Sequence, residues 1–112
     1  LDLCTAGWNT YAAMALPGSL LYKTAIEKNT PLPKNYEGYS FHSYETVPLP
    51  TKKLKAYEIL QMRDEAFINY HTNENFLNLI KKKFGPKAVN NILDMTKIKL
   101  KRKIIEENLN AN

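Results

Sequence analysis

The chain has 112 residues, of which 44% are hydrophobic and 24% charged, and a formal net charge of +5, a composition that predicts one globular domain. No apolar run approaches the roughly 20 residues of a membrane span and no signal-peptide pattern is present, so we expect a cytoplasmic protein without a membrane partner. The excess positive charge lies in the second part. Residues 1–51 carry three Lys and four acidic residues, and residues 52–112 carry thirteen Lys or Arg and seven acidic residues.

Residues that bind metals are few. Cys4 is the only cysteine, so the chain can form no disulfide and has no thiolate set for zinc or an iron–sulfur cluster. His42 and His71 lie far apart in the sequence, with no Cys or carboxylate beside them at ligand spacing. We therefore expect no metal site and interpret both histidines as structural or surface residues.

Residues 8–16 form a short apolar run that ends at the turn-forming pair Pro17-Gly18. This pattern favours a buried strand that ends in a tight turn, although three alanines in a run of this length leave a buried helix open. Ser19 is a good N-cap, and apolar residues then recur at helical spacing, which predicts a helix that ends near Asn29. Because the chain begins at Leu1 with an apolar stretch, we expect it to be a piece of a longer protein.

Residues 30–50 contain four prolines and several aromatic residues. The prolines exclude a packed helix, and the alternation of Tyr39-Ser40-Phe41 is typical of a short strand. Most of the segment is predicted to be an extended connection. Its aromatic residues indicate that it packs either on the helices of this chain or on another body.

Three helices are predicted in the second half, at residues 55–71, 74–84 and 86–107. Arg63 falls within the apolar stripe of the first of them, so its guanidinium should either contact an anion or cover apolar surface while its head pairs with an acid. Thr72 or Asn73 can cap the second helix, and Gly85 and Pro86 predict a sharp corner before the third. Residues 108–112 are expected to fray.

A basic run at residues 97–103 lies inside the last predicted helix. Residues 97–101 alternate with period two, which alone would predict a strand, but the helical period on either side favours a helix. The run could bind phosphates or an anionic surface. It contains no aromatic residue for base stacking and is followed by two glutamates, so a solvated helix face is favoured and nucleic acid is not expected as a partner.

Several segments together resemble the C-terminal end of a radical S-adenosylmethionine protein. The family is the cobalamin-binding-domain class related to the anaerobic magnesium-protoporphyrin monomethyl ester cyclase. The segments are WNTYAAMALPGSLLY (8–22), LPT (49–51), RDEAFINYHTN (63–73), KKKFG (81–85) and KLKRKIIEE (99–107). The first of them is the most specific, because it resembles the last strand of the family's partial (β/α) barrel and the helix that follows.

The resemblance implies a parent enzyme that holds a [4Fe–4S] cluster on a C-x-x-x-C-x-x-C motif, binds S-adenosylmethionine and has cobalamin as a further possible cofactor. None of the three cluster cysteines is in this chain, so we expect it to bind no cofactor by itself. In the family the last barrel strand lies close to the adenosyl group. Strand alternation would place Asn9, Tyr11 and Ala13 on one face, and these are the predicted cofactor-facing residues in the intact barrel.

The predicted fold is therefore mainly α, with about four helices and one or two short strands. It comprises the last strand and helix of a barrel (1–29), a Pro- and aromatic-rich connection (30–50) and a helical extension (51–112). The expected partner is the missing N-terminal barrel, on which the chain would pack and could shape substrate access without independent catalysis. The exposed strand could also pair with a second copy, refold as a helix or be poorly ordered. The alternative is a free-standing helical module whose basic last helix binds an acidic partner or nucleic acid.

Overall fold

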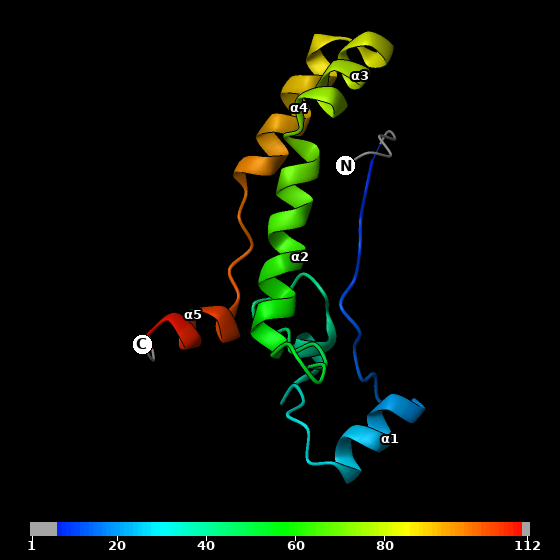
Figure 1. Ribbon diagram of the computed structural model, residues 1–112, viewed down its shortest axis with the longest axis vertical. Coiled ribbons are helices and arrows are strands. Elements are labelled where there is room, and N and C mark those ends of the chain that lie inside the picture. Colours follow the sequence, from blue (N-terminus) through cyan, green and yellow to red (C-terminus); the bar gives the residue numbers. More distant parts are fainter. Residues whose placement is uncertain (1–6, 111–112) are drawn as a thin grey trace. The chain divides into compact units, whose positions relative to one another are not determined.

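A computed structural model describes residues 7–110 of the chain. In chain order the elements are α1 (Leu20–Glu27), the 3-10 helix η1 (Tyr36–Tyr39), α2 (Ala56–His71), α3 (Glu74–Phe84), α4 (Pro86–Lys97) and α5 (Lys103–Asn110) (Figure 1). The prediction of a mainly helical chain is confirmed. The short strands, and with them a partial barrel, are not supported, because residues 7–110 contain no strand.

The chain divides into two compact units, and the boundary falls within α2. Unit 1 comprises Asp64–Lys99 together with the described part of Leu1–Thr10, and unit 2 comprises Tyr11–Arg63 and the described part of Leu100–Asn112. Each unit therefore combines segments that are far apart in the sequence.

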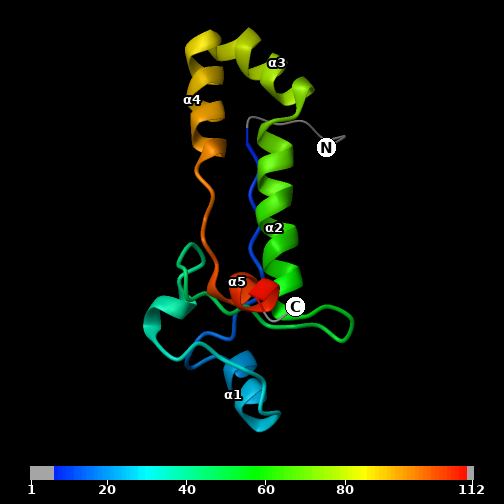
Figure 2. The ribbon, with the colours of Figure 1, turned by 90° about the vertical axis from the view of Figure 1, so that its left-hand side faces the viewer.

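Unit 1 is built on the helices α3 and α4, which contact each other and meet at a corner (Figure 2). Tyr70, Phe76 and Ile80 form its buried core, and apolar residues of both helices pack against them, namely Leu77, Ala88, Val89 and Ile92. The side chain of Asn73 accepts hydrogen bonds from the Asn75 and Phe76 amides at 3.0 and 3.3 Å, which satisfies the first turn of α3. The predicted helix and its cap are confirmed.

The corner between α3 and α4 forms at Gly85, whose φ of 90° is open to glycine but strained for other residues. Its amide still donates to the Lys81 carbonyl at 2.9 Å, which closes α3. Pro86 then occupies the first turn of α4, where its missing N–H costs nothing. The predicted Gly-Pro corner is confirmed.

Aromatic rings surround the core of unit 1. Trp8 stacks on Tyr70 with ring centroids 5.9 Å apart, and the buried His71 ring lies edge-on to Phe76 at 5.3 Å. The Nδ1 atom of His71 is 2.8 Å from the Phe67 carbonyl oxygen. Since a carbonyl can only accept, Nδ1 carries a proton, and His71 is a hydrogen-bonded core residue.

Helix α1 of unit 2 starts as predicted. The Ser19 hydroxyl accepts from the Tyr22 amide at 3.1 Å and donates to the Leu16 carbonyl at 2.6 Å. The helix ends at Glu27, and Asn29 takes a positive φ of 54° just beyond it. The apolar residues that recur at helical spacing in α1 do not form one buried face, because Ala25 is buried whereas Leu21 and Ile26 are exposed.

Residues 7–16 are extended but form neither the predicted strand nor the alternative helix. An extended segment becomes a strand only when a neighbouring segment completes a ladder of hydrogen bonds. Here the Leu49 amide donates to the Ala13 carbonyl at 2.8 Å, a single bond rather than a ladder. The strand prediction was wrong for this reason, although the alternation of its side chains is retained, as described below.

The predicted strand at Tyr39-Ser40-Phe41 was also wrong, because η1 and a series of turns occupy this region. The buried Thr46 hydroxyl lies 2.5 Å from the Ser40 carbonyl oxygen, so the chain folds back on itself here. Gly38 is also buried, and a Cβ at that position would collide with the Pro33 side chain and lie 3.0 Å from the Glu45 carbonyl oxygen. Local side-chain and backbone contacts thus replace strand pairing.

The predicted single helix over residues 86–107 was wrong. Helix α4 ends at Lys97, Ile98 is extended with φ −82° and ψ 107°, and α5 begins only at Lys103. The period-two pattern of residues 97–101 was the better guide to this connection. The C-terminal end of this connection is held by the Lys103 amide, which donates to the Tyr44 carbonyl at 2.9 Å.

None of the helices in the described part of the chain combines the length and apolar character required to cross a membrane.

Candidate functional site

The ring of Phe41 is the centre of a group of side chains in unit 2 that we call the Phe41 cluster: Tyr11, Phe41, Arg63 and Arg102. The Tyr11 ring meets the Phe41 ring edge-on, with centroids 4.9 Å apart and an interplanar angle of 68°. The guanidinium carbons of Arg63 and Arg102 lie 4.9 and 5.9 Å from the Phe41 centroid. These distances are within the range of cation–π attraction.

Arg102 is almost completely buried, with 2% of its surface exposed. Its Nη1 atom donates to the Phe41 carbonyl at 2.7 Å and to the Ser43 carbonyl at 3.1 Å. A buried guanidinium needs such acceptors, because an unpaired charge in the interior is costly. Arg102 therefore ties residues 41–43 to the beginning of α5.

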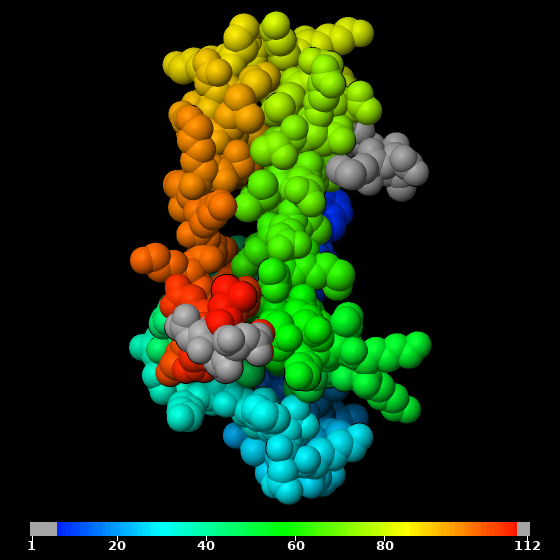
Figure 3. All heavy atoms as spheres, turned by 60° about the vertical axis from the view of Figure 1, so that its left-hand side comes forward, coloured from blue at the N-terminus to red at the C-terminus, as the bar shows by residue number. Residues whose placement is uncertain are grey.

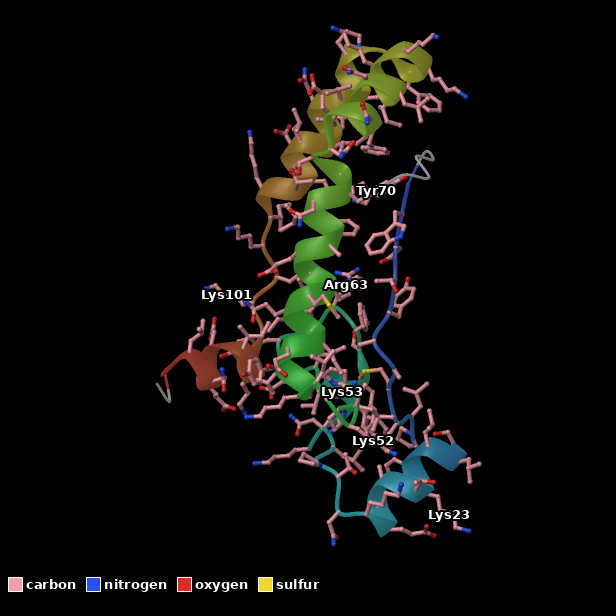
Figure 4. All side chains as sticks on the ribbon, in the orientation of Figure 1. Lys23, Lys52, Lys53, Arg63, Tyr70 and Lys101 are labelled. Carbon is pink, nitrogen blue, oxygen red and sulfur yellow. The ribbon has the colours of Figure 1, made fainter. Side chains whose placement is uncertain are left out.

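Arg63 projects from α2 and is 6% exposed (Figure 4). Its place within the apolar stripe, expected from the sequence, is confirmed. Since arginine stays protonated in proteins, the Phe41 cluster combines two permanent positive charges with two aromatic rings. Such a group can hold the 41–43 segment in place, and the Tyr11 ring at its edge stays exposed.

Two further contacts join the same loop to α5. The Tyr44 hydroxyl donates to a Glu106 carboxylate oxygen at 2.7 Å, and the Lys103 ammonium lies 3.4 Å from Glu45. The hydrogen bond to Glu106 raises the pKa of Tyr44, with burial and the neighbouring negative charges adding to the effect. These contacts are more exposed than the Arg102 bonds, so we expect them to contribute less to stability.

The predicted cofactor-facing residues Asn9, Tyr11 and Ala13 are all exposed, and they alternate with the half-buried Thr10 and Ala12. The predicted separation of the two faces is therefore present in the extended segment. The structure brings Tyr11 to the Phe41 cluster, whereas Ala13 contributes its backbone carbonyl to Leu49. The Asn9 side chain accepts from the Thr10 amide at 2.9 Å. Whether this face meets a cofactor stays a prediction.

The described residues offer no group of three or more His, Cys, Asp or Glu side chains that could hold a metal ion. Cys4 lies outside these residues. A [4Fe–4S] cluster of the type implied by the resemblance requires three cysteines, and the sequence has one, so its residues do not fit that group.

The basic run at residues 97–103 does not form one exposed helix face. Lys97 ends α4 and lies 3.5 Å from Asp94, Arg102 is buried, and Lys103 pairs with Glu45. Lys99 and Lys101 remain exposed on the extended connection, where Figure 4 labels Lys101. Only part of the run is therefore available to an acidic partner.

Sequence reasoning identified Tyr11 and Arg63 but missed Phe41 and Arg102. Phe41 was assigned to a strand and Arg102 to a solvated helix face. The available signal was the period-two pattern at residues 97–101, which indicated that the chain is extended just before Arg102.

The sequence matches no known family, no curated protein and no solved structure.

Proposed function

We propose that this chain is the C-terminal part of a radical S-adenosylmethionine protein of the cobalamin-binding-domain class, where it packs on the (β/α) barrel and shapes substrate access. The proposal starts from the resemblance of residues 8–22 and of four later segments to that family. It assigns the cluster and its electron transfer to the rest of the protein, because the single cysteine of this chain cannot supply the required motif.

One structural observation supports the proposal most directly. The stretch from Tyr11 to Ile26 leaves five large apolar side chains exposed, namely Tyr11, Leu16, Leu20, Leu21 and Ile26. Such a concentration of exposed apolar side chains in one short stretch is typical of an interaction surface. Four of them lie in residues 8–22, the segment that resembles the last barrel strand and the start of its helix, and Ile26 lies on the same helix. This is the part expected to contact the barrel.

A second feature agrees with a strand that lacks its neighbours. Residues 9–13 keep the alternation of a strand, with Asn9, Tyr11 and Ala13 on the exposed side, although no ladder forms in the described residues. In the proposed intact barrel, neighbouring strands would complete the ladder, and the exposed face would lie near the adenosyl group. The amide of Asn9 and the phenol of Tyr11 are suitable partners for a nucleoside.

The first test is to read the gene upstream of the codon for Leu1. The proposal expects an open frame that encodes a barrel with C-x-x-x-C-x-x-C. A frame without that motif would overturn the proposal.

The second test uses the protein encoded by the longest frame, purified without oxygen and supplied with iron and sulfide. Asn9→Ala should weaken S-adenosylmethionine binding by about tenfold, since a hydrogen bond is lost, and should leave the cluster absorbance unchanged. Thr10→Ala, on the opposite face of the same segment, is the matched control and should bind normally. Equal binding by all three proteins would contradict the assigned face.

A further inference from the structure

The corner between α3 and α4 carries a concentrated positive charge that the proposed function does not use. Lysines occupy the last turn of α3 and the first turn of α4, on either side of an exposed aromatic ring. We call these residues the basic corner: Lys81, Lys82, Lys83, Phe84 and Lys87. All five are exposed, and side chains at this corner (yellow) extend outward from the molecule in Figure 3.

The lysines of the basic corner have no acidic neighbours in sequence. Residues 75–93, which cover most of both helices, contain four Lys and no Asp or Glu. In the described part of the chain, no ion pair or hydrogen bond joins these lysine side chains to a carboxylate. The positive charge is therefore available to a partner.

Phe84 is 64% exposed, although it continues the apolar face of α3. Its neighbours on that face, Phe76 and Ile80, are buried against α4, but the chain turns at Gly85 before Phe84 can be covered. At 100° per residue, Lys81 and Lys83 flank Phe84 on the two sides of the helix. An accessible ring between two cations matches the two needs of an unpaired nucleotide, which are a stacking surface and phosphate neutralisation.

The outer faces of both helices continue the same character. On α3, Asn78 follows Asn75 by three positions and Lys82 follows Asn78 by four. On α4, Asn90 and Asn91 lie three and four positions after Lys87. All six are exposed. Asparagine amides bond to phosphate oxygens and base edges, so these faces extend the surface without adding negative charge.

We propose that the basic corner binds single-stranded nucleic acid, with phosphates on the lysines and a base stacked on Phe84. A lipid surface fits less well, because the apolar faces of α3 and α4 are packed against each other and their outer faces carry asparagine. Residues 97–103 were not expected to bind nucleic acid because they lack an aromatic residue for stacking. The basic corner is a different surface, and it has one.

The test measures the fluorescence anisotropy of a labelled RNA of about 20 mixed nucleotides with the full chain at increasing KCl concentrations. Three or four neutralised phosphates predict a slope of about −2 to −3 for log K against log salt concentration. Lys82→Glu with Lys83→Glu should weaken binding at least tenfold. The matched control, Lys52→Glu with Lys53→Glu on the exposed loop before α2 (Figure 4), makes the same charge change and should have less than a threefold effect.

Phe84→Ala tests the stacking step and should weaken binding by about tenfold. Leu109→Ala is its control, because Leu109 is 65% exposed but lies on α5, away in sequence from the basic corner. Circular dichroism verifies that each variant is folded. Equal losses from the two lysine pairs, an unchanged affinity for Phe84→Ala, or binding to phosphatidylserine vesicles but not to RNA would each overturn the proposal.

Discussion

Arg102 is joined to Phe41 in two ways: its Nη1 atom donates to the Phe41 carbonyl at 2.7 Å, and its guanidinium carbon lies 5.9 Å from the centre of the Phe41 ring. The two residues are 61 positions apart in the chain. This relationship closes unit 2, because it connects the loop after η1 with the segment before α5.

Replacing Arg102 with Ala should destabilise unit 2 by about 2–4 kcal/mol, since a buried side chain is removed and the half-buried Phe41 and Ser43 carbonyls lose their donor. The free energy of opening can be measured by hydrogen exchange at the Leu49 amide, which is bonded to Ala13 within unit 2. Lys101→Ala, one position earlier and exposed, should change it by less than about 0.5 kcal/mol. Similar protection of Leu49 in both variants would show that Arg102 does not hold the unit together.

The hydrogen bond from Tyr44 to Glu106 should make the stability of the chain depend on pH in the alkaline range. The pKa of Tyr44 in the folded state is raised above its ordinary value. The stabilisation by this hydrogen bond is therefore complete below about pH 10 and is lost as the pH rises through the folded-state pKa of Tyr44. Urea midpoints measured across this range should fall more for the wild type than for Tyr44→Phe.

Tyr36→Phe is the control for this pH dependence, because Tyr36 is 87% exposed. The urea midpoint of Tyr36→Phe should change with pH as that of the wild type does. Burial, with a smaller effect from Tyr22, also raises the pKa of Tyr39, and this contribution is common to all three proteins and cancels in their differences. Identical pH profiles for Tyr44→Phe and the wild type would contradict the role of the Glu106 bond.

Ser19→Ala should cost about 1 kcal/mol of local stability in α1, because the Tyr22 amide loses its acceptor. Faster hydrogen exchange at Tyr22 is the expected readout. Ser19→Asp keeps a capping oxygen and should retain most of the protection. If the Tyr22 amide were equally protected in Ser19→Ala and Ser19→Asp, the Ser19 side chain would not be the cap of α1.

Phe76→Ala should destabilise unit 1 by about 3–5 kcal/mol, since a fully buried ring is removed from the core around Tyr70 and Ile80. Trp8 is the single tryptophan and stacks on Tyr70, so its fluorescence reports urea unfolding of this unit. Phe84→Ala removes the same side chain from an exposed site and should change stability by less than about 0.5 kcal/mol. Comparable losses from the two substitutions would contradict the assignment of the core.

Local signals predicted α1, α2, α3 and the α3–α4 corner correctly. Ser19, Asn73 and Gly85 act through hydrogen bonds and backbone angles within a few residues of themselves, so the sequence around them contains what is needed. The position of Arg63 on the inner side of α2 was predictable for the same reason, because helical periodicity places it there.

Three predictions failed where the outcome depends on distant residues. Residues 8–16 have the composition of a strand, yet a strand needs a neighbouring segment for its ladder, and none is present in the described chain. The short strand at residues 39–41 gave way to η1 and turns. The predicted last helix breaks before Arg102, whose acceptors are the carbonyls of Phe41 and Ser43.

By itself, then, the sequence determined the helices that begin and end with their own caps, the concentration of positive charge in residues 52–112 and the alternation of residues 9–13. Only the tertiary structure decided that Tyr11, Arg63 and Arg102 meet at Phe41, and that Phe84 stays exposed among lysines. The physical reason is the range of the interactions. Caps and periodicity act within one or two helical turns, whereas a buried guanidinium takes its partners from segments that sequence spacing does not relate.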